Sequence, residues 1–257
     1  MFIPLHDANT LKHISHPYVN YILIAANIII WVISASPAIV DPETAKRAAI
    51  SFGFIPSVVN NLAELPAEFI VIPEKLTYIS YAFLHAHFMH LAGNMLFIWV
   101  FGDNIEDAMG HLRYIAFYLL CAAGAAFFHG LVAQNSNAPL IGASGAAAGI
   151  VAAYLILHPK VRIWILALGR IPLRIPAYIV LGAWIAFQIW NFFANSEDQV
   201  SWAAHIGGLI AGAILIFPFK RKDVPLFDRE PDAATPSSEA SHAEKIPPEP
   251  PSSKWGR

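Results

Sequence analysis

The chain has 257 residues, of which 56% are hydrophobic and only 13% are charged, with a mean hydropathy of +0.52. Soluble domains carry roughly 25% charged residues, so this composition excludes an ordinary soluble protein and predicts a polytopic membrane protein. The formal net charge is −2 and no basic block is present, which excludes nucleic acid as a partner. Cys121 is the only cysteine, so no intramolecular disulfide can form.

Six apolar segments follow one another along the chain. We interpret the first, at 18–35, as a retained helix and not as a signal peptide, because Pro37 would directly follow the possible cleavage site and five more apolar segments come after it. Those five are predicted as helices at about 86–104, 113–133, 144–158, 175–194 and 202–219. The expected fold is therefore an all-α polytopic membrane bundle of six helices.

The composition divides the chain into three regions. Residues 1–17 form a short polar segment, 18–219 form the six-helix membrane domain, and 220–257 form a tail rich in Pro and Ser. We expect the tail to be disordered, because it has too few apolar residues to build a core. The long connection at 36–75 contains two apolar stretches too short to span, which are expected at the membrane interface.

The distribution of Lys and Arg predicts the orientation. The connection between the fourth and fifth helices holds Lys160, Arg162, Arg170 and Arg174, and the tail begins with Lys220-Arg221-Lys222. The turn between the third and fourth helices and the turn between the fifth and sixth contain neither residue type. Because cytoplasmic loops are enriched in Lys and Arg, we expect both termini in the cytoplasm and the second, fourth and sixth helices to enter from the outer side.

Polar residues from these three helices are predicted at a common depth. Ser144, His205 and His90 each precede a charged residue at the cytoplasmic side by 13 to 16 positions, which is about 20–24 Å of helix. Asn94 lies one turn below His90 on the same face. Polar groups inside a membrane are costly and indicate a functional site by default.

Small residues predict that two of these helices touch. GxxxG pairs occur just after the polar residues, at Gly145 with Gly149 and at Gly208 with Gly212. Such faces permit close backbone approach, which would bring Ser144 and His205 within hydrogen-bond reach, as a nucleophile and its general base require. The residues alone leave two functions open, a hydrolytic site and a transport pathway lined by polar groups.

Taken together, these motifs resemble the rhomboid family of intramembrane serine proteases, in its six-helix bacterial type. The residues that carry the resemblance are His85-x4-His90-x3-Asn94, Gly102-x3-Glu106-x3-Gly110, Gly142-x-Ser144-Gly145 and Ala204-His205-x2-Gly208-x3-Gly212. The resemblance covers about residues 18–219. It implies that Ser144 is the nucleophile and His205 its general base, and that His90, Asn94 and the backbone N–H of Ser144 form an oxyanion hole.

The resemblance also assigns supporting roles. His85 would brace the loop after the first helix, Glu106 would tie the cytoplasmic turn, and Gly142 would support the site structurally. The acidic turn at 195–201 would cap the site, and the fifth helix, with Trp184, Phe187 and Trp190, would act as a lateral gate. One departure concerns the aromatic residue that many relatives carry four positions after the serine, which stacks on the catalytic histidine. Here that position is Ala148, and Trp202 is a candidate to replace it.

The implied function is that of an intramembrane serine endopeptidase that cleaves transmembrane segments of other membrane proteins near their outer end. Its partners would be these substrates and the lipid bilayer, with no metal or cofactor, and its location a bacterial inner (plasma) membrane. The alternative is a proteolytically inactive rhomboid-like protein that binds membrane clients.

Overall fold

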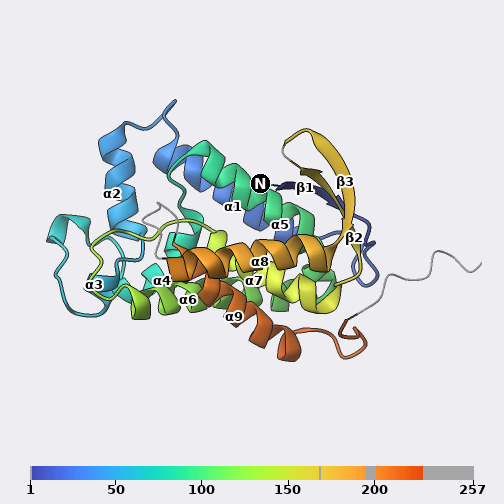
Figure 1. Ribbon diagram of the computed structural model, residues 1–257. Helices are drawn as coiled ribbons and strands as arrows, with labels where there is room; N and C mark the ends of the chain where they lie inside the picture. The colour runs from blue at the N-terminus through green and yellow to red at the C-terminus, as the bar shows by residue number, and fades with distance from the viewer. Residues whose placement is uncertain (1, 168, 195–200, 228–257) are drawn as a thin grey trace, which may run out of the picture.

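The computed structural model describes residues 2–167, 169–194 and 201–227. Its main body is a bundle of helices, with a small sheet at one end (Figure 1). The predicted disordered tail lies outside the described residues from position 228 onward, as does most of the acidic turn predicted to cap the site.

The helices predicted at six places in the sequence are present, with ends that differ by a few residues. They are α1 (Tyr18–Ala35), α5 (Phe88–Met109), α6 (His111–Val132), α7 (Ser144–Leu157), α8 (Ala177–Ala194) and α9 (Trp202–Phe219). Among the described residues, α1, α6, α8 and α9 are long and apolar enough to cross a membrane, so the chain is an integral membrane protein. That α5 and the 14-residue α7 also cross remains a prediction.

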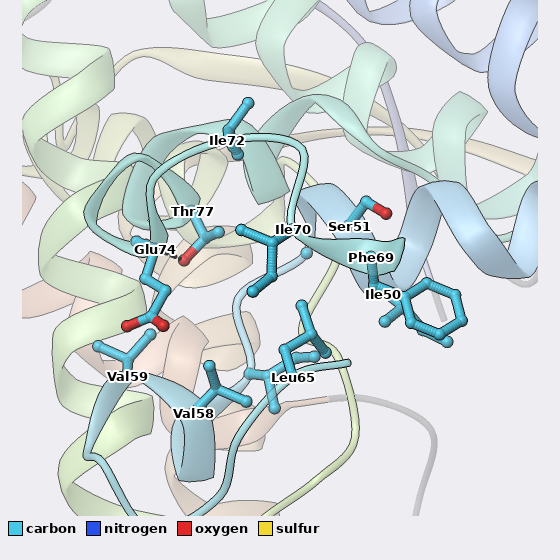
Figure 2. A pocket seen from close by; sticks show the side chains of 12 residues that line it. Ile50, Ser51, Val58, Val59, Leu65, Phe69, Ile70, Ile72, Glu74 and Thr77 are labelled. Carbon is cyan, nitrogen blue, oxygen red and sulfur yellow. Dashed lines mark hydrogen bonds between the residues drawn. The ribbon is translucent and has the colours of Figure 1, made fainter. Parts of the chain in front are cut away.

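The connection between α1 and α5 contains only short helices. These are α2 (Pro42–Phe52), α3 (Pro56–Val59) and α4 (Thr77–Ser80), with single 3-10 turns at Ala67–Phe69, Glu74–Leu76 and Tyr81–Phe83. Figure 2 shows a pocket within this connection, lined mainly by aliphatic side chains such as Val58, Leu65 and Ile70. None of the predicted site residues lines this pocket, so it is separate from the candidate site.

A three-stranded antiparallel sheet corrects the all-α prediction. Strands β1 (Phe2–Asp7), β2 (Arg162–Ala167) and β3 (Ile171–Pro176) pair in the order β1-β2-β3. In β2, Ile163 and Ile165 are buried while Arg162 and Trp164 are exposed, which is the two-residue alternation of a strand with one covered face. The sheet lies at the end of the bundle opposite α2 and α3 (Figure 1).

The N-terminal strand is fixed to the bundle by a buried carboxylate. Oδ2 of Asp7 accepts hydrogen bonds from the Tyr154 hydroxyl on α7 (2.6 Å) and from Nδ2 of Asn104 on α5 (2.9 Å). Burial raises the pKa of Asp7 to about 6, although the bond from Tyr154 lowers it in part. Residues 2–7 are thus an integrated part of the fold.

Candidate active site

Helices α7 and α9 make backbone contact through their glycines. A Cβ atom on Gly208 would overlap the carbonyl oxygen of Gly145, and one on Gly212 would overlap that of Gly149. The close approach predicted from the two GxxxG pairs is therefore confirmed. Gly145 directly follows Ser144, and a Cβ on it would lie 3.5 Å from the carbonyl oxygen of Ala204, so the start of α7 lies against the first two turns of α9.

The candidate nucleophile and base lie at the starts of these helices. Ser144 is the first residue of α7 and is partly buried, and His205 is in the first turn of α9 with 8% of its surface exposed. Ser201 caps α9, because its hydroxyl accepts from the backbone N–H of Ala204 (3.2 Å) and also bonds Nδ1 of His129 (2.8 Å). Within the described residues no hydrogen bond joins Ser144 to His205. Catalytic hydrogen bonds are often long without substrate and tighten in the complex.

The start of α7 has no side-chain cap. The side chain of the preceding residue, Ala143, offers no acceptor, and its carbonyl accepts only from the N–H of Ala147, so the backbone N–H groups before Ala147, beginning with that of Ser144, lack partners within the helix. The helix dipole also favours negative charge at this end. The chemistry available beside Ser144 is therefore the binding of an anion.

The segment before Ser144 packs directly on His90. Gly142 has φ of +122°, in the region that favours glycine, and a Cβ on it would lie 2.6 Å from Nε2 of His90 and 3.6 Å from Nδ2 of Asn94. The backbone N–H of Gly142 donates to the carbonyl of Tyr81 (3.0 Å). The structure thus brings His90, Asn94 and the residues leading into Ser144 together.

His85 stands behind this group. Its Nε2 accepts from Nδ2 of Asn94 (3.0 Å) and from the backbone N–H of Ala143 (3.4 Å), and its ring meets that of His90 edge-on at 5.0 Å. An amide has two N–H donors, so the bond to His85 leaves Asn94 one more. These contacts support the segment before Ser144. His85 also lines a pocket with Ala45 and Ala49 of the connection after α1, and its predicted bracing of that loop stays a prediction.

Glu106 lies far from this group, at the opposite end of α5. Its carboxylate is fully buried, accepts from the backbone N–H groups of Val19 (3.0 Å) and Asn20 (2.7 Å), and pairs with His111. It thereby caps the start of α1, where a negative charge is favourable. These contacts reach α1 as well as the turn between α5 and α6, and the structural role of Glu106 stays a prediction.

The imidazole of His205 is supported by rings from two elements. Trp184 of α8 stacks on it with centroids 6.2 Å apart and planes at 29°, and Trp202 meets it edge-on at 5.8 Å. Ala148 is fully buried in a small cluster against which Trp184 packs. The small side chain at position 148 therefore leaves room for an indole from α8. Trp202 is the residue expected here from the sequence, whereas the stacking role of Trp184 is evident only in the structure.

One polar contact of His205 was also missed. Oε1 of Gln188, on α8, lies 2.7 Å from Nδ1 of His205, and only 2% of Gln188 is exposed. A signal was present in the sequence, because an amide within an apolar membrane helix calls for a functional explanation. Trp184, one turn before Gln188, also contacts the ring of Phe97 on α5 at 5.5 Å.

Several known proteins are similar to this chain over about half of its length. A family model described as Rhomboid domain matches residues 73–222. The chain is 30% identical over 152 residues to Rhomboid protein 1, mitochondrial, of Saccharomyces cerevisiae, which covers 56% of this chain and 41% of that protein. It is 35% identical over 147 residues to Rhomboid protease AarA of Providencia stuartii, which covers 51% of each.

A chloroplast protein is among the other relatives. Rhomboid-like protein 11, chloroplastic, of Arabidopsis thaliana is 27% identical over 153 residues, covering 56% of this chain and 52% of that protein. The chain spans about half the length of these curated relatives or less. The names of these relatives place some of them in mitochondria or chloroplasts. The location of this protein in a bacterial inner membrane therefore remains a prediction. The family model covers 150 of the 257 residues (73 to 222), and the chain belongs to the rhomboid family.

Proposed function

We propose that this protein is an intramembrane serine endopeptidase in which Ser144 is the nucleophile and His205 the general base. The observation that carries the proposal is the glycine contact between α7 and α9, because it brings the start of α7 against the turn that bears His205. The relative named as a protease, AarA, adds support. Ser144 and His205 would act as a dyad without a carboxylate.

The reaction would proceed in two halves. His205 takes the proton of the Ser144 hydroxyl while Oγ attacks the scissile carbonyl carbon, and the resulting tetrahedral intermediate collapses to an acyl-enzyme when His205 returns the proton to the leaving amine. Water then attacks the acyl group in the same way, with His205 as base, and releases the new carboxylate and the Ser144 hydroxyl.

The negative charge of the tetrahedral intermediate needs donors that are already in place. The backbone N–H of Ser144, at the uncapped start of α7, and the remaining N–H of Asn94 are suited to this role, and His90 packs beside them. Removing one such donor typically reduces kcat by about 10²–10³-fold. His85 would hold Asn94 and the backbone of Ala143 in place through its two hydrogen bonds.

The proposed orientation puts the sheet in the cytoplasm. Arg162, Arg170 and Arg174 lie on or beside β2 and β3, and cytoplasmic loops concentrate such residues. Both ends of the membrane domain would then face the cytoplasm, and Ser144 would lie toward the outer side. A substrate would be the transmembrane segment of another protein, locally unwound near its outer end, because an intact helix engages its carbonyls in hydrogen bonds.

A reporter assay tests the proposal. The purified protein is reconstituted in vesicles with a panel of fluorogenic single-span substrates, and cleavage is compared with that of Ser144→Ala and His205→Ala. We expect cleavage by the natural sequence only. Cleavage that persists in Ser144→Ala would refute the dyad. Binding of substrate segments without cleavage of any of them would favour the alternative, a rhomboid-like protein that binds clients without cutting them.

A further inference from the structure

We infer that Gln188 is a positioning residue that holds His205 as the tautomer required of a general base. The position of α8 thereby determines whether His205 has the tautomer and the ring orientation that the dyad needs. The inference rests on the proposed function. It starts from the contact between Oε1 of Gln188 and Nδ1 of His205 at 2.7 Å.

The orientation of the Gln188 amide follows from its second partner. Nε2 of Gln188 is 3.2 Å from the backbone carbonyl oxygen of Trp184. A carbonyl oxygen can only accept, so the NH2 group of the amide must face Trp184 and its oxygen must face His205. Both polar atoms of the buried amide are then satisfied.

The orientation of the amide in turn fixes the proton on His205. Because the oxygen of Gln188 can only accept, Nδ1 of the imidazole must carry a hydrogen. In the neutral ring Nε2 is then the unprotonated nitrogen and is available to take a proton from Ser144. Once the ring is protonated, the bond from Nδ1 becomes charge-assisted and stronger. Before proton transfer, Gln188 thus favours the His205 tautomer that can act as a base. After proton transfer, it stabilises the His205 imidazolium.

The same helix also holds the plane of the ring. Trp184 lies one turn before Gln188, so both side chains emerge from one face of α8, and its indole stacks on the imidazole. Trp184 is in turn in contact with Phe97 on α5. A displacement of α8 away from α5 would remove the hydrogen bond and the stacking partner of His205 together.

Substitution of Gln188 tests the positioning role. Gln188→Leu removes the acceptor, and we expect kcat to fall roughly 10–100-fold while KM changes less than about twofold, because a buried, oriented hydrogen bond is lost and substrate contacts are retained. Gln188→Glu keeps an oxygen acceptor at this position. It should recover most of kcat and move the acidic limb of the kcat–pH profile to higher pH, since a carboxylate makes the imidazole more basic.

A matched control lies on the same helix. Nδ2 of Asn191 donates to the carbonyl of Phe187 (2.7 Å), as Nε2 of Gln188 does to that of Trp184, one turn back in each case. Asn191→Leu makes the same change of amide to alkyl group, and we expect its kcat to stay within about twofold of the natural sequence. An equal fall in both variants would overturn the inference, because the effect would then belong to α8 in general.

A spectroscopic readout separates the inference from the proposed function. ¹⁵N NMR of the His205 side chain is recorded in Ser144→Ala, with and without Gln188→Leu, and neither measurement requires cleavage. We expect a single Nδ1–H tautomer in the first and a mixture in the second. An Nε2–H tautomer in the first, or a Gln188→Leu enzyme with unchanged kcat and pH profile, would refute the inference. Absence of Ser144-dependent cleavage in the natural sequence would refute the proposed function instead.

Discussion

Gly142 and His90 are packed so closely that no side chain fits between them, since a Cβ at position 142 would lie 2.6 Å from Nε2 of the histidine. The φ of +122° at Gly142 adds a second restriction. We expect Gly142→Ala to lose about 1–3 kcal/mol of stability through backbone strain and to reduce cleavage at least about tenfold, because His90 must move.

A second glycine separates these two effects. Gly169, in the turn between β2 and β3, also has a positive φ (+69°), but a Cβ there meets nothing within 4 Å. Gly169→Ala should therefore lower the midpoint of thermal unfolding through backbone strain. Its cleavage rate should stay that of the natural sequence. If Gly142→Ala cleaved at the natural rate, His90 would not need the position that it has here.

Asn94 provides the sharpest test of the proposed oxyanion hole. Asn94→Ala removes an amide donor next to Gly142, in the segment before Ser144, and should lower kcat by about 10²-fold with little change in KM, because in the proposed role the donor acts on charge that develops only in the transition state. Met89, on the same helix, is 71% exposed, and Met89→Ala serves as the control. Steady-state kinetics on the reporter would contradict the assignment if Asn94→Ala changed KM alone.

The contact between α7 and α9 predicts a strong effect at Gly208. Gly208→Ala places a methyl group onto the backbone oxygen of Gly145, so the helices must separate, and we expect a loss of about 3 kcal/mol together with loss of cleavage. The control is Gly182→Ala on α8, where a Cβ meets open space and alanine is the better helix former by about 1 kcal/mol. Thermal unfolding in detergent compares the two, and equal midpoints would contradict the packing.

Asp7 predicts a pH dependence of stability. The pKa of its carboxyl group is about 6 in the folded chain and 3.8 in the reference state, so the folded state binds the proton more tightly. The resulting stabilisation is complete below about pH 4 and is lost as the pH rises to about 6, in total at most about 3 kcal/mol. Asp7→Asn keeps an acceptor for Tyr154 and should lose less stability between pH 4.5 and 7.5, as measured by thermal unfolding. A parallel pH dependence in both proteins would rule out this role of Asp7.

The helices and the backbone contact at the candidate site were accessible from the sequence, because hydropathy and glycine spacing are local signals. Segment lengths predicted α6, α8 and α9 to within a few residues, and the two GxxxG pairs predicted that α7 meets α9. Helix α5 extends to Met109, beyond the predicted end at 104, because Glu106 and Asp107 are buried with partners and do not mark a loop.

The sheet and the stacking of Trp184 on His205 depend on contacts between distant segments and were not accessible in this way. β1 and β2 are separated by more than 150 residues, and the alternation of β2 lies in a connection that its arginines mark as a loop. Ala148 indicated only that the usual aromatic partner of the His205 ring was missing from α7. Trp184 of α8 takes that place because of how the two helices pack, and the sequence of α7 does not encode this packing.

The placement of β1 also has a consequence for the order of assembly during synthesis. β1 is made before the helices of the bundle, yet it pairs with a strand that begins at Arg162, and its Asp7 bonds with Tyr154, a partner 147 residues later. β1 must therefore stay unpaired until α7, the last helix before β2, and β2 itself have been made. Because closing so long a loop is slow compared with local helix formation, the docking of β1 would be a late step that closes the sheet end of a bundle already partly formed. An affinity tag fused ahead of Phe2 would then impair maturation more than one placed after the C-terminal residue.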